Sequence, residues 1–262
     1  MILMAGAIVM ILVAIGYANN IINLKVAQNE FDGNKQFMAT TGQQLDDIAW
    51  TIGRTQTITY TSKLGTLKFE PDALIYTVAI HSSVSGWTNK SYTTGIVLYN
   101  MPVSSLEMGS TYFERVPSTA NSSIVQYGSS APVAQVFCEE KLAMTDGNNV
   151  RIVLVPMIRV LNSTVTGNYV KFYLPTLQGG AIQYLSQTLT LTGEGIVKTK
   201  VSSVDQIIIS VSYPKAALGF DSSFFRFNSN SVTLNSTSTP KLTAGSTVEF
   251  YGGEVQVSIG AV

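Results

Sequence analysis

The chain begins with residues Met1–Leu24, MILMAGAIVMILVAIGYANNIINL, in which no side chain carries a charge. The segment is apolar through Ile15, and the first charged residue is Lys25. A helix needs about 20 mostly apolar residues to cross the hydrocarbon core of a bilayer. The segment has that length, so it predicts an apolar helix that requires lipid or a protein interior around it.

The residues that follow keep an apolar stripe on a polar background. Members of the stripe recur every seven positions: Leu24, Phe31, Met38, Leu45 and Ile52. This spacing predicts an amphipathic continuation of the helix. We therefore expect a helical region over 1–54, apolar in 1–24 and amphipathic in 25–54. The stripe packs either against its own domain alone, or against both the head and neighbouring helices.

Two features modify this expected helix. The triplet Asp32-Gly33-Asn34 is turn-like and Gly42 is a weak helix former, so a kink is an alternative to a straight rod. Small residues in the apolar part favour close contact between helices. Together with the stripe they are our candidates for packing in a helical core: Ala5, Gly6, Ala14 and Ala18.

From Thr55 onward the apolar period changes to two, as in β-strands. Such runs predict strands at 73–81, 94–99, 133–138, 150–161, 169–174, 182–191, 196–201, 206–212, 247–251 and 255–259. Turn signals lie between them: Asp146-Gly147, Gly179-Gly180 and Gly252-Gly253. We expect an α+β chain: a long N-terminal hydrophobic α-helix, then an all-β antiparallel sandwich-like head over 55–262. The head forms one large sandwich or two stacked ones, with a candidate boundary at 193–204.

The composition narrows the classes of function. The formal net charge is 0, and charged residues make up 12% of the 262 residues. Nucleic-acid binding requires clustered Lys and Arg, so we expect no nucleic-acid partner. Chains with a net charge near zero tend to associate, which favours a protein that binds copies of itself. The single Cys138 permits no intramolecular disulfide, and we interpret it as a small buried side chain.

Residue patterns for catalysis are weak. The single His81 precedes Ser82, but no G-x-S-x-G motif accompanies them. Ser212–Lys215 has the S-x-x-K spacing, but the proline inside it opposes the helical turn that this motif requires. Glu139 and Glu140 are adjacent, so on a strand they face opposite sides. No metal, phosphate or dinucleotide motif is present, so we expect no catalytic residue, metal or cofactor and no enzymatic activity.

Four N-x-S/T sequons mark candidate N-glycosylation sites: Asn89, Asn121, Asn162 and Asn235. Ser and Thr are so frequent in this chain that the number of sequons is not informative. Their placement is more informative, because three lie in loop-like stretches and Asn162 follows the end of a predicted strand. This placement favours surface positions.

The N-terminal segment lacks the basic start of a secretory signal peptide, because no Lys or Arg precedes Lys25. The segment is also awkward as a plain membrane anchor, because Lys25 would draw the β head toward the cytoplasm. A short basic leader, removed just before Met1, would resolve both difficulties. We therefore expect a processed N-terminus.

The order of apolar helix, amphipathic extension and Thr/Val/Tyr-rich β head resembles the archaeal type IV pilin and archaellin superfamily. The resemblance lies in the architecture of the whole chain and in residues 1–52, not in a sharp motif. It implies that a dedicated peptidase removes the leader, that the helices bundle in a filament core, and that β-sandwich heads form the outside. Two departures stand out. Bacterial type IV pilins have a glutamate near the fifth mature residue, where this chain has Ala5, and the head is larger than that of a typical archaeal pilin.

The resemblance implies a structural subunit of an extracellular, cell-surface filament for adhesion or motility. Its partners would be identical subunits in a helical homopolymer, the membrane before assembly and the pilus assembly machinery. Independently, an uncharged exposed helix favours polymerisation, because monomers rarely expose so large an apolar surface. The alternatives are a monomeric membrane-anchored adhesin or minor pilin, and an anchored enzyme acting, for instance, on glycans.

Overall fold

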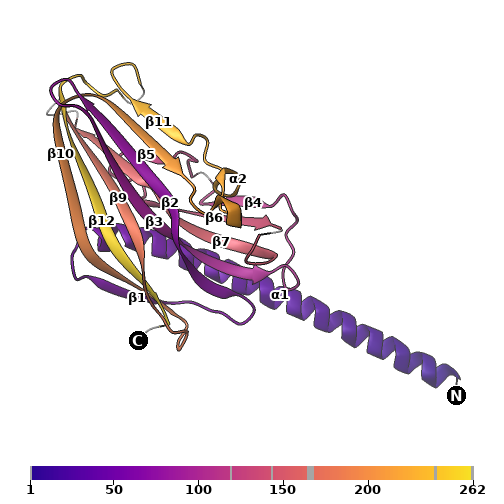
Figure 1. Cartoon of the computed structure of the whole chain (residues 1–262). Helices are drawn as coiled ribbons and strands as arrows, with labels where there is room; N and C mark the ends of the chain where they lie inside the picture. The colour runs from indigo at the N-terminus through magenta and orange to yellow at the C-terminus, as the bar shows by residue number, and fades with distance from the viewer. Residues whose placement is uncertain (1, 119, 143, 164–167, 239–240, 261–262) are drawn as a thin grey trace.

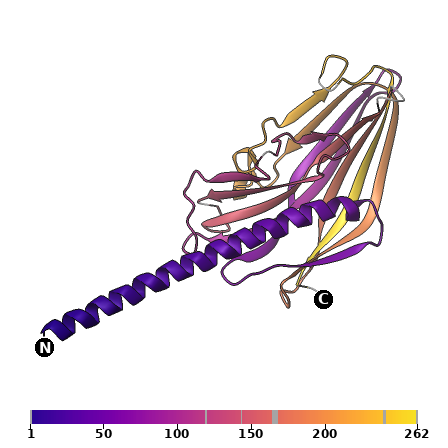
Figure 2. The same ribbon diagram turned by 180° about the vertical axis from the view of Figure 1, so that it is seen from behind.

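The computed structural model describes residues 2–118, 120–142, 144–163, 168–238 and 241–260, with side chains from residue 10 onward except those of 162 and 163. The chain forms one long N-terminal helix and a large, mostly β head (Figure 1). Helix α1 spans Ile2–Ala49, which is 48 residues. It is about 72 Å long at a rise of 1.5 Å per residue. Its C-terminal part lies along the head and its N-terminal part projects away from it (Figure 2).

Helix α1 runs without interruption through Asp32-Gly33-Asn34 and Gly42, so the alternative of a kink is wrong. The reason is contact with the head. The Asn34 amide donates to the carbonyl oxygen of Thr61 at 2.6 Å, which holds this turn of the helix in place. Gly42 faces Leu154, whose Cδ1 lies 3.4 Å from the position that a Cβ would occupy. Packing therefore compensates for weak helix formers in the middle of the helix.

The helix ends at Ala49, before the expected boundary at 54, and the first strand begins at Thr55 as predicted. The strands are β1 Thr55–Thr59, β2 Thr66–Ser82, β3 Gly86–Pro102, β4 Phe113–Val116, β5 Val125–Tyr127, β6 Ala134–Lys141, β7 Asn149–Pro156, β8 Ile158–Ser163, β9 Tyr169–Ile182, β10 Thr188–Ser212, β11 Ser231–Leu234 and β12 Ser246–Ile259. A 3₁₀ turn, Ala216–Leu218, and a one-turn helix α2, Ser222–Phe225, connect β10 to β11. The short strands β4, β5 and β11 were not predicted, and the run 182–191 contains the connection between β9 and β10.

Within the described residues the strands form one sheet in the order β4-β6-β7-β3-β2-β10-β12-β9-β8-β5, and β1 and β11 pair with β10. Most neighbouring strands are antiparallel, but β12 with β9 and β5 with β8 are parallel. The expectation of a purely antiparallel head is therefore wrong, and the sheet is mixed. A short connection joins β9 to β10, and these two strands run in opposite directions. The last strand, β12, lies between them. It must therefore run parallel to one of them and antiparallel to the other.

Glycines that resemble turn signals in the sequence lie inside strands. Gly179-Gly180 belongs to β9 and Gly252-Gly253 to β12. A Cβ on Gly253 would lie 2.5 Å from the carbonyl oxygen of Ala49, so this glycine makes room for the end of α1. Gly193 does the same, because its Cβ would lie 2.5 Å from the carbonyl oxygens of Ile48 and Thr51, on either side of the helix end. Because Gly193 lies within β10, the candidate boundary at 193–204 falls inside one continuous strand.

The sheet buries apolar side chains on both faces. One cluster, the head core, fills the inside of the curled sheet between β2, β3 and β7 on one side and β9, β10 and β12 on the other. A second cluster, the helix–sheet core, lies between α1 and the opposite face of β3, β6 and β7. Along β3, Leu98 belongs to the head core, whereas Val97 and Tyr99 belong to the helix–sheet core. Burial on both faces explains why these central strands are continuous apolar runs in the sequence.

Candidate functional site

Helix α1 consists of two segments with different surroundings. Residues 27–49, the docked segment, lie against the head, whereas residues 10–26, the bare segment, are exposed on all sides (Figure 2). The large exposed apolar side chains of the bare segment are Met10, Ile11, Leu12, Val13, Ile15, Tyr17, Ile21, Ile22, Leu24 and Val26. By length and composition the helix is able to cross a membrane. A contiguous apolar surface of this kind marks a site of contact with a partner or a membrane.

The predicted packing residues divide between these segments. Three stripe residues are buried in the helix–sheet core: Phe31, Met38 and Leu45. Leu24 is 44% exposed and Ile52 is 66% exposed, so neither is buried in that core. Ala14 and Ala18 are exposed in the bare segment. Ala5 and Gly6 belong to α1, but they lie outside the residues whose side chains are described.

Glu30 fastens the start of the docked segment to the head. Its Oε1 accepts hydrogen bonds from the backbone N–H groups of Lys63, Leu64 and Gly65 at 2.9, 2.9 and 3.1 Å, and from the Tyr99 hydroxyl. Burial acts to raise the pKa of Glu30, but the bonds from Tyr99 and the three N–H groups together hold that pKa below its usual value. A carboxylate that is only 6% exposed thus fixes the loop after β1 to the helix.

A second anchor lies near the other end of the docked segment. Asp46 accepts hydrogen bonds from Nη1 of Arg159 at 2.6 Å and from Nε1 of Trp50 at 2.8 Å. The Trp50 ring meets Tyr173 edge-on with centroids 5.1 Å apart, and the Arg159 guanidinium lies 5.2 Å from the same Tyr173 centroid. The two anchors are separated by roughly four helical turns. They set the direction of α1, so the bare segment does not fold back onto the head.

Sequence reasoning missed both anchors. Glu30 directly precedes the stripe residue Phe31, and Asp46 directly follows Leu45. A charged residue at the edge of an apolar stripe is therefore the signal that the sequence contains. That signal is too common on amphipathic helices to identify an anchor, because most such residues face solvent.

The residues weighed as catalytic candidates are engaged in other contacts. Nδ1 of His81 lies 2.5 Å from Oδ1 of Asp205, and its ring lies 4.9 Å from that of Trp87. The Ser82 hydroxyl donates to the carbonyl oxygen of Ser202 at 2.9 Å and not to the imidazole. In the described part of the chain, no group of three or more His, Cys, Asp or Glu side chains is placed to hold a metal ion.

Glu139 and Glu140, neighbours on β6, have opposite surroundings. Glu140 accepts hydrogen bonds from the backbone N–H groups of Met108 and Gly109 at 2.7 and 2.9 Å. Glu139 is buried, and among the described residues its Oε1 has no hydrogen-bond partner. Burial raises the pKa of Glu139 to about 8, although the nearby Arg151 favours its charged form. The pair is therefore not a matched acid and base facing one cleft.

Cys138 is buried in the helix–sheet core as predicted. Burial raises the pKa of its thiol to about 12, so the thiol stays protonated at neutral pH. It behaves as a small apolar side chain beneath α1.

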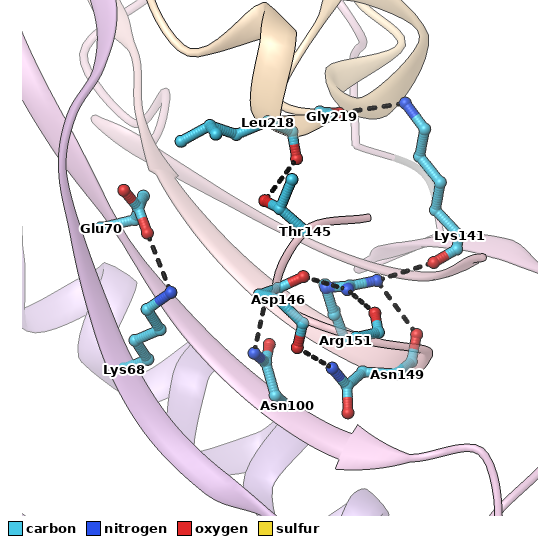
Figure 3. Close-up of polar contacts among 11 residues, drawn as sticks. Lys68, Glu70, Asn100, Lys141, Thr145, Asp146, Asn149, Arg151, Leu218 and Gly219 are labelled. Carbon is cyan, nitrogen blue, oxygen red and sulfur yellow. Dashed lines mark hydrogen bonds and ion pairs between the residues drawn. The ribbon is translucent and has the colours of Figure 1, made fainter. Parts of the chain in front are cut away.

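A buried polar cluster around Arg151 holds the turn between β6 and β7 (Figure 3). Nη2 of Arg151 lies 2.5 Å from Oδ1 of Asp146 and donates to the carbonyl oxygen of Gly147 at 2.8 Å. Nη1 donates to the carbonyl oxygens of Lys141 and Asn149 at 2.9 and 3.1 Å. The turn predicted at Asp146-Gly147 is confirmed, and these contacts give the buried guanidinium a structural role.

The four sequon asparagines have different environments. Asn89 is exposed within β3 and not in a loop. Asn121 and Asn235 lie outside the strands, and Oδ1 of each accepts a hydrogen bond from the backbone N–H two residues later, at 3.0 and 2.9 Å. Asn162 lies in β8, and its side chain is outside the described ones.

Comparison with protein-family models, with curated proteins and with solved structures gave no match to this chain. The candidate site is therefore defined by geometry. Among the described residues, the bare segment is the large apolar surface for which the chain itself provides no cover. What this surface offers chemically is association with lipid or with other apolar helices.

Proposed function

We propose that the protein is a structural subunit of an extracellular filament of the type IV pilus or archaellum kind, and that it polymerises through α1 for adhesion or motility. One observation carries the proposal: residues 10–26 expose apolar side chains on every side, while the docked segment is fastened at both ends. A bare segment held in this way is accessible to other molecules. The bare segments of identical copies offer one another apolar surfaces of the same composition.

The energetics favour burial among copies once the helix leaves a membrane. Burying roughly 400 Å² of apolar surface contributes about 10 kcal/mol before the costs of association. A contact between different surfaces of identical copies that does not close on itself generates a helical filament. Before assembly, the same helix is accommodated by the membrane because its length matches the hydrocarbon core.

In such a filament the helices occupy the centre and the heads the outside. We infer that the curled sheet, with the head core between its halves, serves as a sandwich-like outer layer. The exposed sequon Asn89 then lies on the filament surface. The partners in this proposal are identical subunits, the membrane and the assembly machinery. The proposed role requires no cofactor, nucleic acid or catalytic residue.

The second candidate is a membrane-anchored monomeric adhesin or minor pilin, which the length and composition of α1 also favour. Shearing of cells separates the two candidates. We expect the protein in the sheared supernatant as long polymers visible by electron microscopy. Retention of all protein in the membrane fraction until detergent is added would support the anchored monomer instead.

A substitution tests the role of the bare segment directly. Ala14→Glu places a charge in the middle of the proposed helical core, and we expect it to abolish sheared polymers. The matched control is Val84→Glu, which introduces the same charge at an 82% exposed position of the β2–β3 connection. Normal polymers from Ala14→Glu would contradict a core made of these helices.

A further inference from the structure

A groove lies where α1 leaves the head, and we refer to it as the neck groove. Its volume is about 550 Å³. One wall belongs to the bare segment and contains Asn20, Asn23, Leu24 and Val26. The other wall belongs to the head and includes Leu64, Val103 and Glu107. The head wall also includes Ser104 and Ser105, so the lining mixes apolar and polar side chains, with two amides on the helix wall and a carboxylate on the head wall.

The head wall of the neck groove is held rigidly. Leu106, next to Glu107, is buried in the helix–sheet core, and the backbone N–H of Ser105 donates to the carbonyl oxygen of Pro102 at 2.8 Å. On the other side of Glu107, the N–H groups of Met108 and Gly109 are fixed by the carboxylate of Glu140. Glu107 itself is exposed, and these contacts hold the backbone that carries it.

Lys25 is the single charged residue of the bare segment. Its Nζ donates to Oε1 of Gln28 at 3.2 Å, and among the described residues neither Lys25 nor Glu107 takes part in an ion pair. When other copies cover the bare segment, Lys25 loses water and requires an anionic partner. Glu30 is already occupied by four donors, which leaves Glu107 as the acid that lines the groove.

We propose that the neck groove binds the bare segment of a second copy of this chain, with Lys25 of that copy facing Glu107. This inference rests on the proposed function and adds the contact that sets the register between subunits. The apolar side chains around Lys25, such as Ile21 and Ile22, pack against Leu64 and Val103 of the neighbour. Asn20 and Asn23 provide hydrogen bonds that an apolar interface alone would lack. A single charged pair between the two chains defines one alignment of the contact.

Charge reversal in two separate subunits tests this contact. Lys25→Glu alone and Glu107→Lys alone each place like charges together at every contact, so we expect about a tenfold or larger loss of sheared polymer for each. Expressed together, the two variants restore polymers. The carboxylate introduced in one copy then meets the ammonium introduced in the other, while the native Lys25 and Glu107 meet each other. An ion pair within one chain would not be restored by such mixing.

Matched controls are Lys90→Glu and Glu194→Lys, which reverse charges on exposed head positions outside the groove. We expect both to assemble like the native chain. A second measurement joins copies with Lys25→Cys to copies with Glu107→Cys, and we expect a disulfide-linked dimer, since the native Cys138 is buried.

Assembly of the single reversals at native levels, or failure of the mixture to assemble, would overturn the register contact and leave the filament proposal standing. Failure of the native chain to form polymers would overturn the filament proposal itself. In each case thermal unfolding of the detergent-solubilised variants, with the native transition retained, shows that the head is folded.

Discussion

The docked and bare segments of α1 belong to one continuous helix, yet they differ in every contact they make. The docked segment buries Phe31, Met38 and Leu45 and turns polar residues such as Gln36 and Gln43 outward. The bare segment exposes large apolar side chains along its length and approaches the head only at its C-terminal end. Both segments are therefore helical, whereas the burial of their side chains depends on whether the head offers an apolar surface to pack against. The docked segment contributes to the core of the subunit, and in the proposed filament the bare segment provides the contacts between subunits.

The largest expected effect separates the two segments by truncation. Phe31→Ala removes a ring from the helix–sheet core and should lower the free energy of unfolding by about 3–5 kcal/mol. Leu12→Ala, at a 62% exposed position, should change it by no more than about 0.5 kcal/mol. Urea unfolding of detergent-solubilised subunits measures both. In sheared polymers we expect the opposite order: Leu12→Ala should lower the temperature at which filaments dissociate more than Phe31→Ala does. Equal effects in the solubilised subunit would remove the distinction between the segments.

The next effect concerns the anchor at Glu30. Glu30→Ala leaves three N–H groups and the Tyr99 hydroxyl without an acceptor, and should cost about 2–4 kcal/mol at pH 7. The pKa of Glu30 in the folded chain lies below its ordinary value of 4.5. Its contribution is therefore present at neutral pH and is lost as the pH falls from 4.5 through the folded pKa.

Urea unfolding of the native chain and Glu30→Gln at pH 7, 5 and 3 checks this sign. The difference between them should shrink toward pH 3. A constant difference would show that the charge of Glu30 does not hold the helix.

Glu139 offers the opposite case, a buried carboxyl in the head. Its pKa is raised to about 8 from 4.5. Between these pH values the folded chain therefore binds a proton that the unfolded chain has lost. The stability of the native chain should therefore fall as the pH rises from 4.5 to 8. Glu139→Gln removes this dependence and should be more stable than the native chain by about 1–3 kcal/mol at pH 8, with little difference at pH 5. Unfolding by urea at the two pH values measures it. A variant equally destabilised at both would indicate that Glu139 carries its charge in the fold.

The smallest structural changes add one methyl group at two glycines. Gly33→Ala meets nothing within 4 Å and should stabilise the docked helix by about 0.5–1 kcal/mol. Gly253→Ala directs its Cβ to within 2.5 Å of the Ala49 carbonyl and should destabilise by about 1–3 kcal/mol. Thermal unfolding of both variants compares them. A stabilising Gly253→Ala would show that the end of α1 is free to move off the strand.

Several of the sequence predictions failed at glycine. Gly253 belongs to a predicted turn signal and Gly193 begins the candidate domain boundary, but both are strand residues that let the end of α1 approach the sheet. The sequence shows that a glycine has no side chain. It does not show which distant segment packs into the space that this leaves. The anchors Glu30 and Asp46 escaped for the same reason, because their partners Tyr99 and Arg159 are far away in the chain.

The residues in order are enough to predict the long N-terminal helix, the start of the β region at Thr55 and the approximate positions of most long strands, because hydrophobic period is a local property. They are also enough to predict that residues 1–24 need an apolar environment. The strand order, the parallel entry of β12 and the division of α1 into docked and bare segments depend on contacts between distant residues, and no local period records such contacts. The same helix carries apolar side chains along its whole length, and the folded head covers only those that its own surface can reach.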